Sequence, residues 1–368
     1  MTRLLPLHTL TFPATLLMVA GLSLVPAGCS QRNDPAENFA DYNARLSRAL
    51  ETALPPAAAT RVPTWPAARD LVQEPPGLPA GEFAFRDFGR CGLLQEISER
   101  NGGPGRTQAP PQRLLYELRL LRGLRQCAHL TAGDLAGDDT ARRVFAGTVR
   151  DVLAQQEREL PQVYWNATFA APEFREFFSV SALPLRPGDG DAAGLAAAAL
   201  TALAGVGRLG PETPLPASDA LEQHYYRLVG NKLGGRTWLS LDLASRELDR
   251  ASSALEETRP ERLCPGGKPG QQALRLKSVY DGVYVQRLQP WLGETGRTAD
   301  QLALALERLW QAQQTTPPPV LVQYRLNVWA GVPGALVHDY DASVRRHARA
   351  WQRLLEPCGY VAAATPAP

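Results

Sequence analysis

Four cysteines in the main part of the chain restrict how it can fold. They are Cys91, Cys127, Cys264 and Cys358, and a fifth, Cys29, lies near the N-terminus. In an oxidising compartment an even set of cysteines pairs into disulfides, and each bridge forces two segments to lie side by side. We therefore expect a fold organised around two cross-links, provided that the chain is exported.

The first residues have the composition of a bacterial export signal. Arg3 is the only charged residue before Cys29, and an apolar run from Phe12 to Val25 leads to small residues at Ala27 and Gly28. The run is shorter than the roughly 20 apolar residues that span a membrane, and its small-residue end is typical of a cleavage site. The sequence thus predicts that residues 1–28 are a cleaved signal peptide.

Two cleavage routes fit this segment. Ala27-Gly28-Cys29 matches the end of a bacterial lipobox, in which the cysteine is acylated, although Pro26 stands where leucine is usual. Val25 and Ala27 would also suit an ordinary signal peptidase, which would leave a free Cys29 thiol. The even number of remaining cysteines favours acylation, and several acyl chains form a stable anchor. We expect a periplasmic lipoprotein anchored through Cys29, and Ser30 in place of a retaining aspartate favours the outer membrane.

Hydrophobic periodicity predicts a mainly α fold. Asp34 is placed to cap a helix that starts at Pro35, and the helix carries one apolar face. Further helices are expected near 91–100, 110–127, from 139 onward, 195–206, 218–232, 236–258, 270–289, 298–314 and 335–356. Val320–Tyr324 is the best strand candidate. The expected class is a multi-helix, bundle-like domain with long Pro-rich connections and at most one or two short strands.

Composition divides the chain into four parts, of which the first is the predicted signal peptide at residues 1–28. Residues 29–81 should hold the lipid-anchored N-terminal helix and a Pro/Ala-rich extended segment, which either lies over the domain or acts as a loose spacer. We expect the helical periplasmic domain at residues 82–360 and a disordered tail at residues 361–368.

The order of the helices suggests which cysteines pair. Antiparallel packing of the helices at 91–100 and 110–127 would bring Cys91 close to Cys127. A bridge from Cys264 to Cys358 would then tie the last helix to the rest of the domain. The cross-pairings Cys91–Cys264 and Cys127–Cys358 remain open.

The sequence gives little sign of catalysis. It contains no nucleophile elbow, zinc-protease, P-loop or dinucleotide-binding motif and no C-x-x-C pair. We expect no cofactor and no metal, because the histidines are scattered. His338–Asp341 is interpreted as a helix N-terminus, and His347 as a core histidine on an apolar stripe. The formal net charge of +2 gives no reason to expect nucleic acid.

The sequence leaves three hypotheses about function. The favoured hypothesis is non-catalytic binding of an envelope protein or ligand through the helical surface, because the catalytic signatures are missing. An envelope hydrolase acting on cell-wall glycan or peptide would need two converging carboxylates, and the candidates are Glu96, Glu99, Glu117 and Glu173. A carrier of an apolar ligand could use the space around Leu195–Val206.

Several stretches resemble one family. They are Cys91-Gly92-Leu93, Glu99-Arg100-Asn101, Gln112–Glu117, Cys127, Trp165–Thr168 and Pro172–Phe174. These are similar to the signature stretches of a bacterial lipoprotein family catalogued as domain of unknown function 3080. The resemblance spans essentially the whole mature chain, and it implies a lipoprotein of unknown activity.

The polar residues of these stretches are the candidate site. Arg100, Asn101, Arg113, Tyr116 and Glu117 fall on the two helices that a Cys91–Cys127 bridge would join. They form either a polar network that locks this hairpin or the lining of a ligand cleft. Trp165 and Asn166 combine a buried aromatic ring with an amide that could fix a loop.

Overall fold

The computed structural model describes residues 34–75, 85–101, 108–136, 138–180, 183–208, 214 and 216–360. The predicted signal peptide, Cys29 and the tail at 361–368 lie outside this part, as do the side chains of Arg100 and Asn101. In the described residues every regular element is helical and no strand occurs, which confirms the mainly α prediction. No helix among them combines the length and apolarity that crossing a membrane requires.

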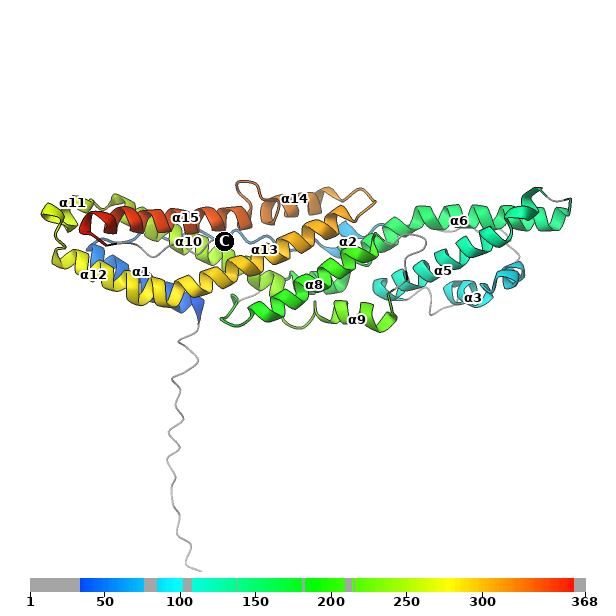
Figure 1. The fold of residues 1–368 in the computed structure, drawn as a ribbon, viewed down its shortest axis with the longest axis horizontal. Helices are drawn as coiled ribbons and strands as arrows, with labels where there is room; N and C mark the ends of the chain where they lie inside the picture. The colour runs from blue at the N-terminus through cyan, green and yellow to red at the C-terminus, as the bar shows by residue number, and fades with distance from the viewer. Residues whose placement is uncertain are drawn as a thin grey trace, which may run out of the picture.

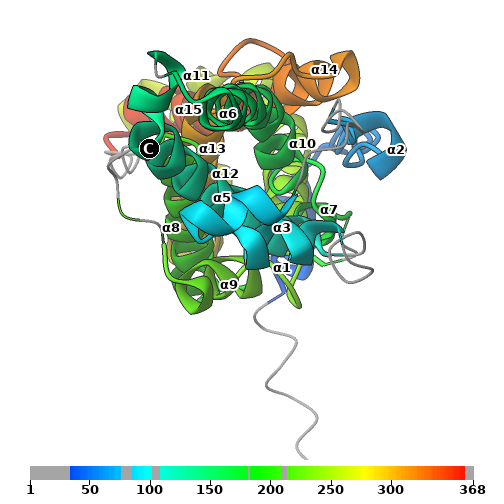
Figure 2. The same cartoon turned by 90° about the vertical axis from the view of Figure 1, so that its right-hand side faces the viewer.

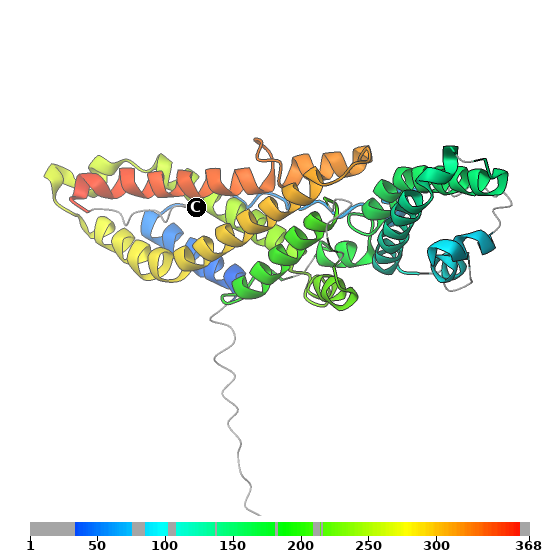
Figure 3. The ribbon, with the colours of Figure 1, turned by 45° about the vertical axis from the view of Figure 1, so that its right-hand side comes forward.

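The helices form an elongated molecule with two parts (Figure 1). The larger part, here the body, contains α1, α2 and the helices from α7 onward. The smaller part, here the tip, contains α3 and the far ends of α5 and α6, and it stands apart from the body in Figure 3. In the view along the long axis, α3, α5 and α6 lie in front of the body helices (Figure 2).

The body is built on long amphipathic helices around one apolar core. At the start of α1, the Asp34 carboxylate accepts a hydrogen bond from the Ala36 backbone N–H at 2.9 Å, which satisfies a donor at the open end of the helix. The body helices are α1 (Pro35–Leu50), α2 (Ala68–Leu71), α7 (Pro172–Phe177), α8 (Gly190–Val206), α9 (Ser218–Tyr226), α10 (Leu233–Glu257), α11 (Pro260–Leu263), α12 (Gln271–Val279), α13 (Gln289–Gln311), α14 (Pro319–Val328) and α15 (Leu336–Leu355).

The sequence predicted two helices, at 270–289 and 298–314, where the structure has one continuous helical run from α12 through α13. A π-helical stretch, η5 (Tyr280–Leu288), joins the two α-helices. At its end the Gln289 N–H donates to the carbonyl of Tyr284, five residues earlier. Pro290, which has no backbone N–H, follows in the first turn of α13, and the helical run continues through it.

The predicted strand at Val320–Tyr324 is wrong, since these residues belong to α14. Pro319 occupies the first position of this helix, which suits its fixed φ. Leu321, Tyr324 and Val328 are buried at a helical spacing of three and four residues. The β-branched valines that suggested a strand are overridden by this packing.

The tip has a small core of its own. Its helices are η2 (Phe85–Cys91), α3 (Leu94–Asn101), α5 (Pro110–Leu130), η3 (Ala132–Ala136) and α6 (Thr140–Asn166). Buried apolar side chains from these elements form a separate cluster: Phe88, Leu93, Ile97, Tyr116, Leu120, Leu124, Cys127, Phe145, Val149 and Val152. The Cys91–Cys127 disulfide packs in this cluster and ties η2 to α5.

Both disulfides join neighbours in the order of the cysteines. Cys91 pairs with Cys127 and Cys264 with Cys358, with Cα–Cα distances of 5.3 and 5.2 Å. The second bridge ties the chain after α15 to the loop after α11. The cross-pairings left open by the sequence do not occur.

Residues 52–75, here the strap, run over the body in a mostly extended conformation that is interrupted only by α2. Trp65 is buried in the core, where its ring stacks on Phe178 with 4.7 Å between the ring centroids. The Arg61 backbone N–H donates to the carboxylate of Asp242, which is fully buried on α10. The strap is thus packed against the body at several points.

Candidate functional site

The polar residues of the tip hold its helices together. The Tyr116 hydroxyl donates to the backbone carbonyl of Glu96, which links α5 to α3. Glu117 is 1% exposed and accepts a hydrogen bond from Gln156 Nε2 at 2.7 Å, which links α5 to α6. Arg113 lies 3.5 Å from the same carboxylate. These contacts favour the locking interpretation for Arg113, Tyr116 and Glu117.

Trp165 and Asn166 hold the strap. The Trp165 indole N–H donates to the carbonyl of Leu71 at 2.6 Å. The Asn166 side chain accepts from the Gln73 N–H at 3.0 Å and donates to the Gln73 carbonyl at 2.6 Å. A backbone segment paired in this way needs no sheet to satisfy its polar groups. The two residues act as a clamp between α6 and the chain after α2.

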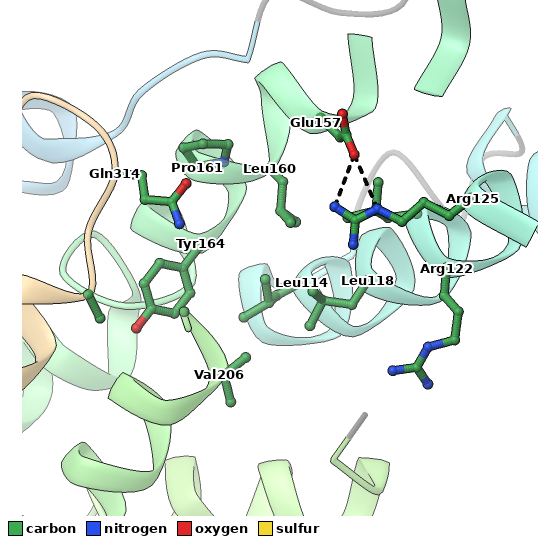
Figure 4. Close-up of a pocket in the computed structure, with 13 residues that line it drawn as sticks. Leu114, Leu118, Arg122, Arg125, Glu157, Leu160, Pro161, Tyr164, Val206 and Gln314 are labelled. Carbon is green, nitrogen blue, oxygen red and sulfur yellow. Dashed lines mark hydrogen bonds and ion pairs between the residues drawn. The ribbon is translucent and has the colours of Figure 1, made fainter. Parts of the chain in front are cut away.

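A groove opens where the tip joins the body, and we call it the junction groove (Figure 4). Its volume is about 370 Å³, within the range of small-molecule sites. It brings together α5, α6, the end of α8 and the chain after α13. Its lining residues are Leu114, Leu118, Leu121, Arg122, Arg125, Glu157, Leu160, Pro161, Tyr164, Val206, Gly207, Ala312 and Gln314.

The junction groove is apolar at its base and charged on one side. Leu114 and Leu118 form the base and also belong to the body core. On the charged side the Arg125 guanidinium donates to Glu157 Oε1, at 2.9 Å from Nη2 and 3.1 Å from Nε. Arg122 lies almost one turn earlier on α5 and points away from this pair (Figure 4). Among the described lining residues Glu157 is the only carboxylate.

Two backbone features shape the groove. Pro161 lies inside α6 and has no N–H, so the carbonyl of Glu157 loses its helical hydrogen-bond partner at the groove wall. At the other end, Gly207 stands against Tyr164, and a Cβ at this position would lie 2.4 Å from the tyrosine ring. Tyr164 is fixed there by donating to the Leu203 carbonyl at 2.9 Å. Burial raises the pKa of Tyr164, and the Gly207 backbone and the charge of Arg208 oppose part of this rise.

His347 and the His338–Asp341 segment have structural roles. His347 is completely buried between Tyr42, Ser252 and Trp351, as expected for a core histidine. At the start of α15, Asp339 accepts from the Gly334 N–H and the Arg61 guanidinium, each at 2.9 Å. Partial burial favours a higher pKa for Asp339, but these hydrogen bonds outweigh it and hold the pKa below its ordinary value.

The carboxylates proposed for a hydrolase are dispersed. Glu96 and Glu117 belong to the tip, whereas Glu173 is on α7, near Tyr225 in the body. The side chain of Glu99 lies outside the described residues. None of the three placed carboxylates lines the junction groove.

Residues 39–361, which are most of the chain, match the sequence model of the family described as "Protein of unknown function (DUF3080)". The chain belongs to the DUF3080 family. No curated protein and no solved structure matches it. In this DUF3080 protein the matched residues include both disulfides, the strap and every residue that lines the junction groove.

Sequence reasoning did not find the junction groove of this DUF3080 protein. Its residues come from four segments between positions 114 and 314 that only the packed fold brings together. Two local features of the sequence could have pointed to this region. Arg122 and Arg125 share a face of a leucine-rich helix, and Pro161 interrupts a strong helical pattern.

Proposed function

We propose that this DUF3080 protein is a lipid-anchored protein of the cell envelope that binds an envelope ligand without transforming it. The junction groove is the proposed binding site. The observation that carries the proposal is a groove of about 370 Å³ with a leucine base and an arginine–glutamate pair at its edge. Concave, largely apolar sites with a few placed polar groups are typical of ligand binding.

The chemistry of the groove supports binding more than hydrolysis. Glycoside hydrolysis uses two carboxylates on either side of the scissile bond. Within the described lining Glu157 is the only acid, and it is paired with Arg125. The alternative of an envelope hydrolase has no comparable support at this site.

The proposed location rests on the N-terminal segment and the cysteines. The two disulfides use Cys91, Cys127, Cys264 and Cys358, which leaves Cys29 as the remaining cysteine. An acylated Cys29 would hold the protein at a membrane, and we propose the periplasmic side of the outer membrane.

Mass spectrometry of the protein isolated from bacterial membranes tests the anchor. We expect a mature chain that starts at Cys29 and carries acyl groups, and we expect Cys29→Ala to abolish acylation and release the protein from the membrane. A mature protein with an unmodified Cys29 thiol would overturn the anchor.

Crosslinking in living cells tests the binding site. A photoreactive amino acid at Gln314, exposed at the edge of the junction groove, should capture a ligand. The matched control is the same residue at Gln352, exposed on α15 in the body. Equal capture from both positions, or none from Gln314, would contradict the proposal.

A carrier of an apolar ligand is the second candidate. The observation in its favour is that Val206, the last residue of the Ala/Leu-rich helix α8, lines the junction groove beside the leucines of α5. A carrier would release its ligand to an acceptor membrane, so transfer of a bound ligand to vesicles would separate this function from simple binding.

A further inference from the structure

A second groove lies between the strap and two helices of the body, and we call it the strap groove. Its volume is about 560 Å³, within the range of small-molecule sites. Residues 55–61 of the strap, 246–253 of α10 and 339–346 of α15 line it, and the two helices run side by side (Figure 1). The strap groove and the junction groove have no lining residue in common.

Every charged side chain that lines the strap groove has a partner of opposite charge. Arg61 pairs with Asp339 at 2.9 Å, and Arg246 pairs with the buried Asp242 at 2.8 Å. The remaining ion pairs are Arg250–Glu247, Arg346–Asp249 and Arg346–Glu256. A charged ligand would find no opposite charge that lacks a partner, so the groove favours an uncharged ligand.

The wall of the groove nevertheless has hydrogen-bonding capacity that the protein does not use. Ser343 is 4% exposed, and its hydroxyl makes no hydrogen bond with any residue that the structure describes. Arg250 donates to Glu247 from Nη1, while its Nε is buried without a hydrogen-bond partner in the same part of the chain. A buried donor without a partner costs free energy. The Arg250 guanidinium therefore gains a hydrogen bond by turning towards an acceptor in the groove.

The apolar part of the lining is small. It consists of Pro55, Pro56 and Ala58 on the strap and Ala342 on α15. Among the described lining residues there is no long aliphatic or aromatic side chain to receive the hydrophobic anchor of a peptide. The two proline rings offer a C–H surface on which the carbon face of a sugar ring can pack.

The strap wall is fixed in place before any ligand binds. The Arg61 backbone N–H donates to the Asp242 carboxylate at 3.0 Å, and the Arg246 guanidinium donates to the carbonyl of Ala58 at 3.2 Å. A wall that is already ordered lowers the entropy cost of binding.

We infer that the strap groove binds an uncharged oligosaccharide. Each sugar hydroxyl both donates and accepts hydrogen bonds, so one ligand supplies an acceptor for Arg250 and a partner for Ser343 while every ion pair of the wall stays intact. This site is additional to the ligand site proposed for the junction groove, and either one can exist without the other.

Ligand-observed NMR titration of the mature protein, in a detergent without a sugar head group, tests the ligand class. The probes are maltotriose and tri-N-acetylchitotriose. Trigalacturonate is the anionic control, and N-acetyl-trialanine amide is the uncharged peptide control. We expect at least one of the uncharged trisaccharides to bind tenfold or more tightly than both controls.

Variants locate the binding site. Ala342→Trp, at a half-buried position of the lining, should fill the groove and abolish saccharide binding. Ala348→Trp, at a half-buried position of α15 outside the groove, is the matched control and should leave the affinity unchanged. Ser343→Ala and Arg250→Lys should each weaken binding about fivefold to tenfold, because each removes a polar contact while lysine keeps the charge beside Glu247. The melting temperature reports whether each variant is folded.

The inference is overturned if neither trisaccharide binds, or if the peptide or trigalacturonate binds as tightly as the trisaccharides. Equal affinities of Ala342→Trp and Ala348→Trp would overturn the location. If Ala342→Trp does not fold, the two polar variants decide, and wild-type affinity in both would overturn the assigned contacts.

Discussion

The imidazole Nε2 of His347 lies 2.8 Å from the hydroxyl of Tyr42, a residue 305 positions earlier in the chain. The Trp351 indole N–H donates to the same hydroxyl at 2.9 Å, and the Ser252 hydroxyl lies 2.9 Å from the other imidazole nitrogen. These contacts join α1, α10 and α15 inside the core. Burial lowers the pKa of His347 to about 3, with a smaller contribution from the charge of Arg346, so the ring is neutral at physiological pH.

This histidine should make the protein less stable in acid. Its pKa in the folded protein lies below the ordinary 6.5, so the unfolded chain binds the proton more readily between the two values. The contribution to stability is complete above pH 6.5 and is lost as the pH falls towards 3, by about 1.4 kcal/mol for each pH unit.

Urea unfolding between pH 7.5 and about 4.5 measures this effect. His347→Gln should be less stable than the wild type at pH 7 but should lack that part of the acid-side slope. His129→Gln, at an exposed position on α5, should keep the wild-type slope. An unchanged slope in His347→Gln would show that other groups cause the acid sensitivity.

Removing the disulfides should destabilise the protein to different extents. The bridges close loops of 36 and 94 residues, for which chain entropy gives at most about 4 and about 5 kcal/mol. We expect Cys264→Ala with Cys358→Ala to lower the free energy of unfolding more than Cys91→Ala with Cys127→Ala. Urea unfolding under non-reducing conditions measures both. The reverse order would mean that the tip depends on its bridge beyond loop entropy.

Loss of the Asn166 clamp should loosen the strap. Asn166→Ala removes both hydrogen bonds to Gln73, at a cost of about 1–3 kcal/mol. We expect trypsin to cleave faster after Arg61 and Arg69, which lie within the strap. Asn327→Ala, at an exposed position on α14, is the matched control. Cleavage at the wild-type rate in Asn166→Ala would show that the other contacts of the strap hold it without Asn166.

The same substitution should have opposite effects at two helical glycines. At Gly235 on α10 a Cβ would lie 1.9 Å from the Ser179 carbonyl oxygen, a backbone atom that cannot move aside easily. At Gly205 on α8 nothing lies within 4 Å of a Cβ. Gly235→Ala should lower the melting temperature strongly, whereas Gly205→Ala should stabilise the protein by up to about 1 kcal/mol. A stabilising Gly235→Ala would contradict the close approach of α10 to the chain after α7.

Local patterns predicted much of the fold. The apolar stripe from Phe39 to Leu50 and its Asp34 cap specified α1, since both act within a few residues of chain. The strand prediction for Val320–Tyr324 was wrong because a short apolar run with valines fits either a strand or a helix. The burial of Leu321 and Tyr324 on one face of α14 favours the helix. The junction groove could not be predicted, because it exists only where helices distant in sequence meet.

The pairing of Tyr42 with His347 has a consequence for biosynthesis. Helix α1 is made first, but the network that buries its tyrosine closes only when α15, close to the end of the chain, has been made. Until then the apolar face of α1 lacks part of its cover and is open to premature association, as in other chains dominated by distant contacts. A nascent chain of this protein therefore exposes part of the apolar face of α1 until α15 has been synthesised. A chain that ends before α15 would keep this face exposed permanently.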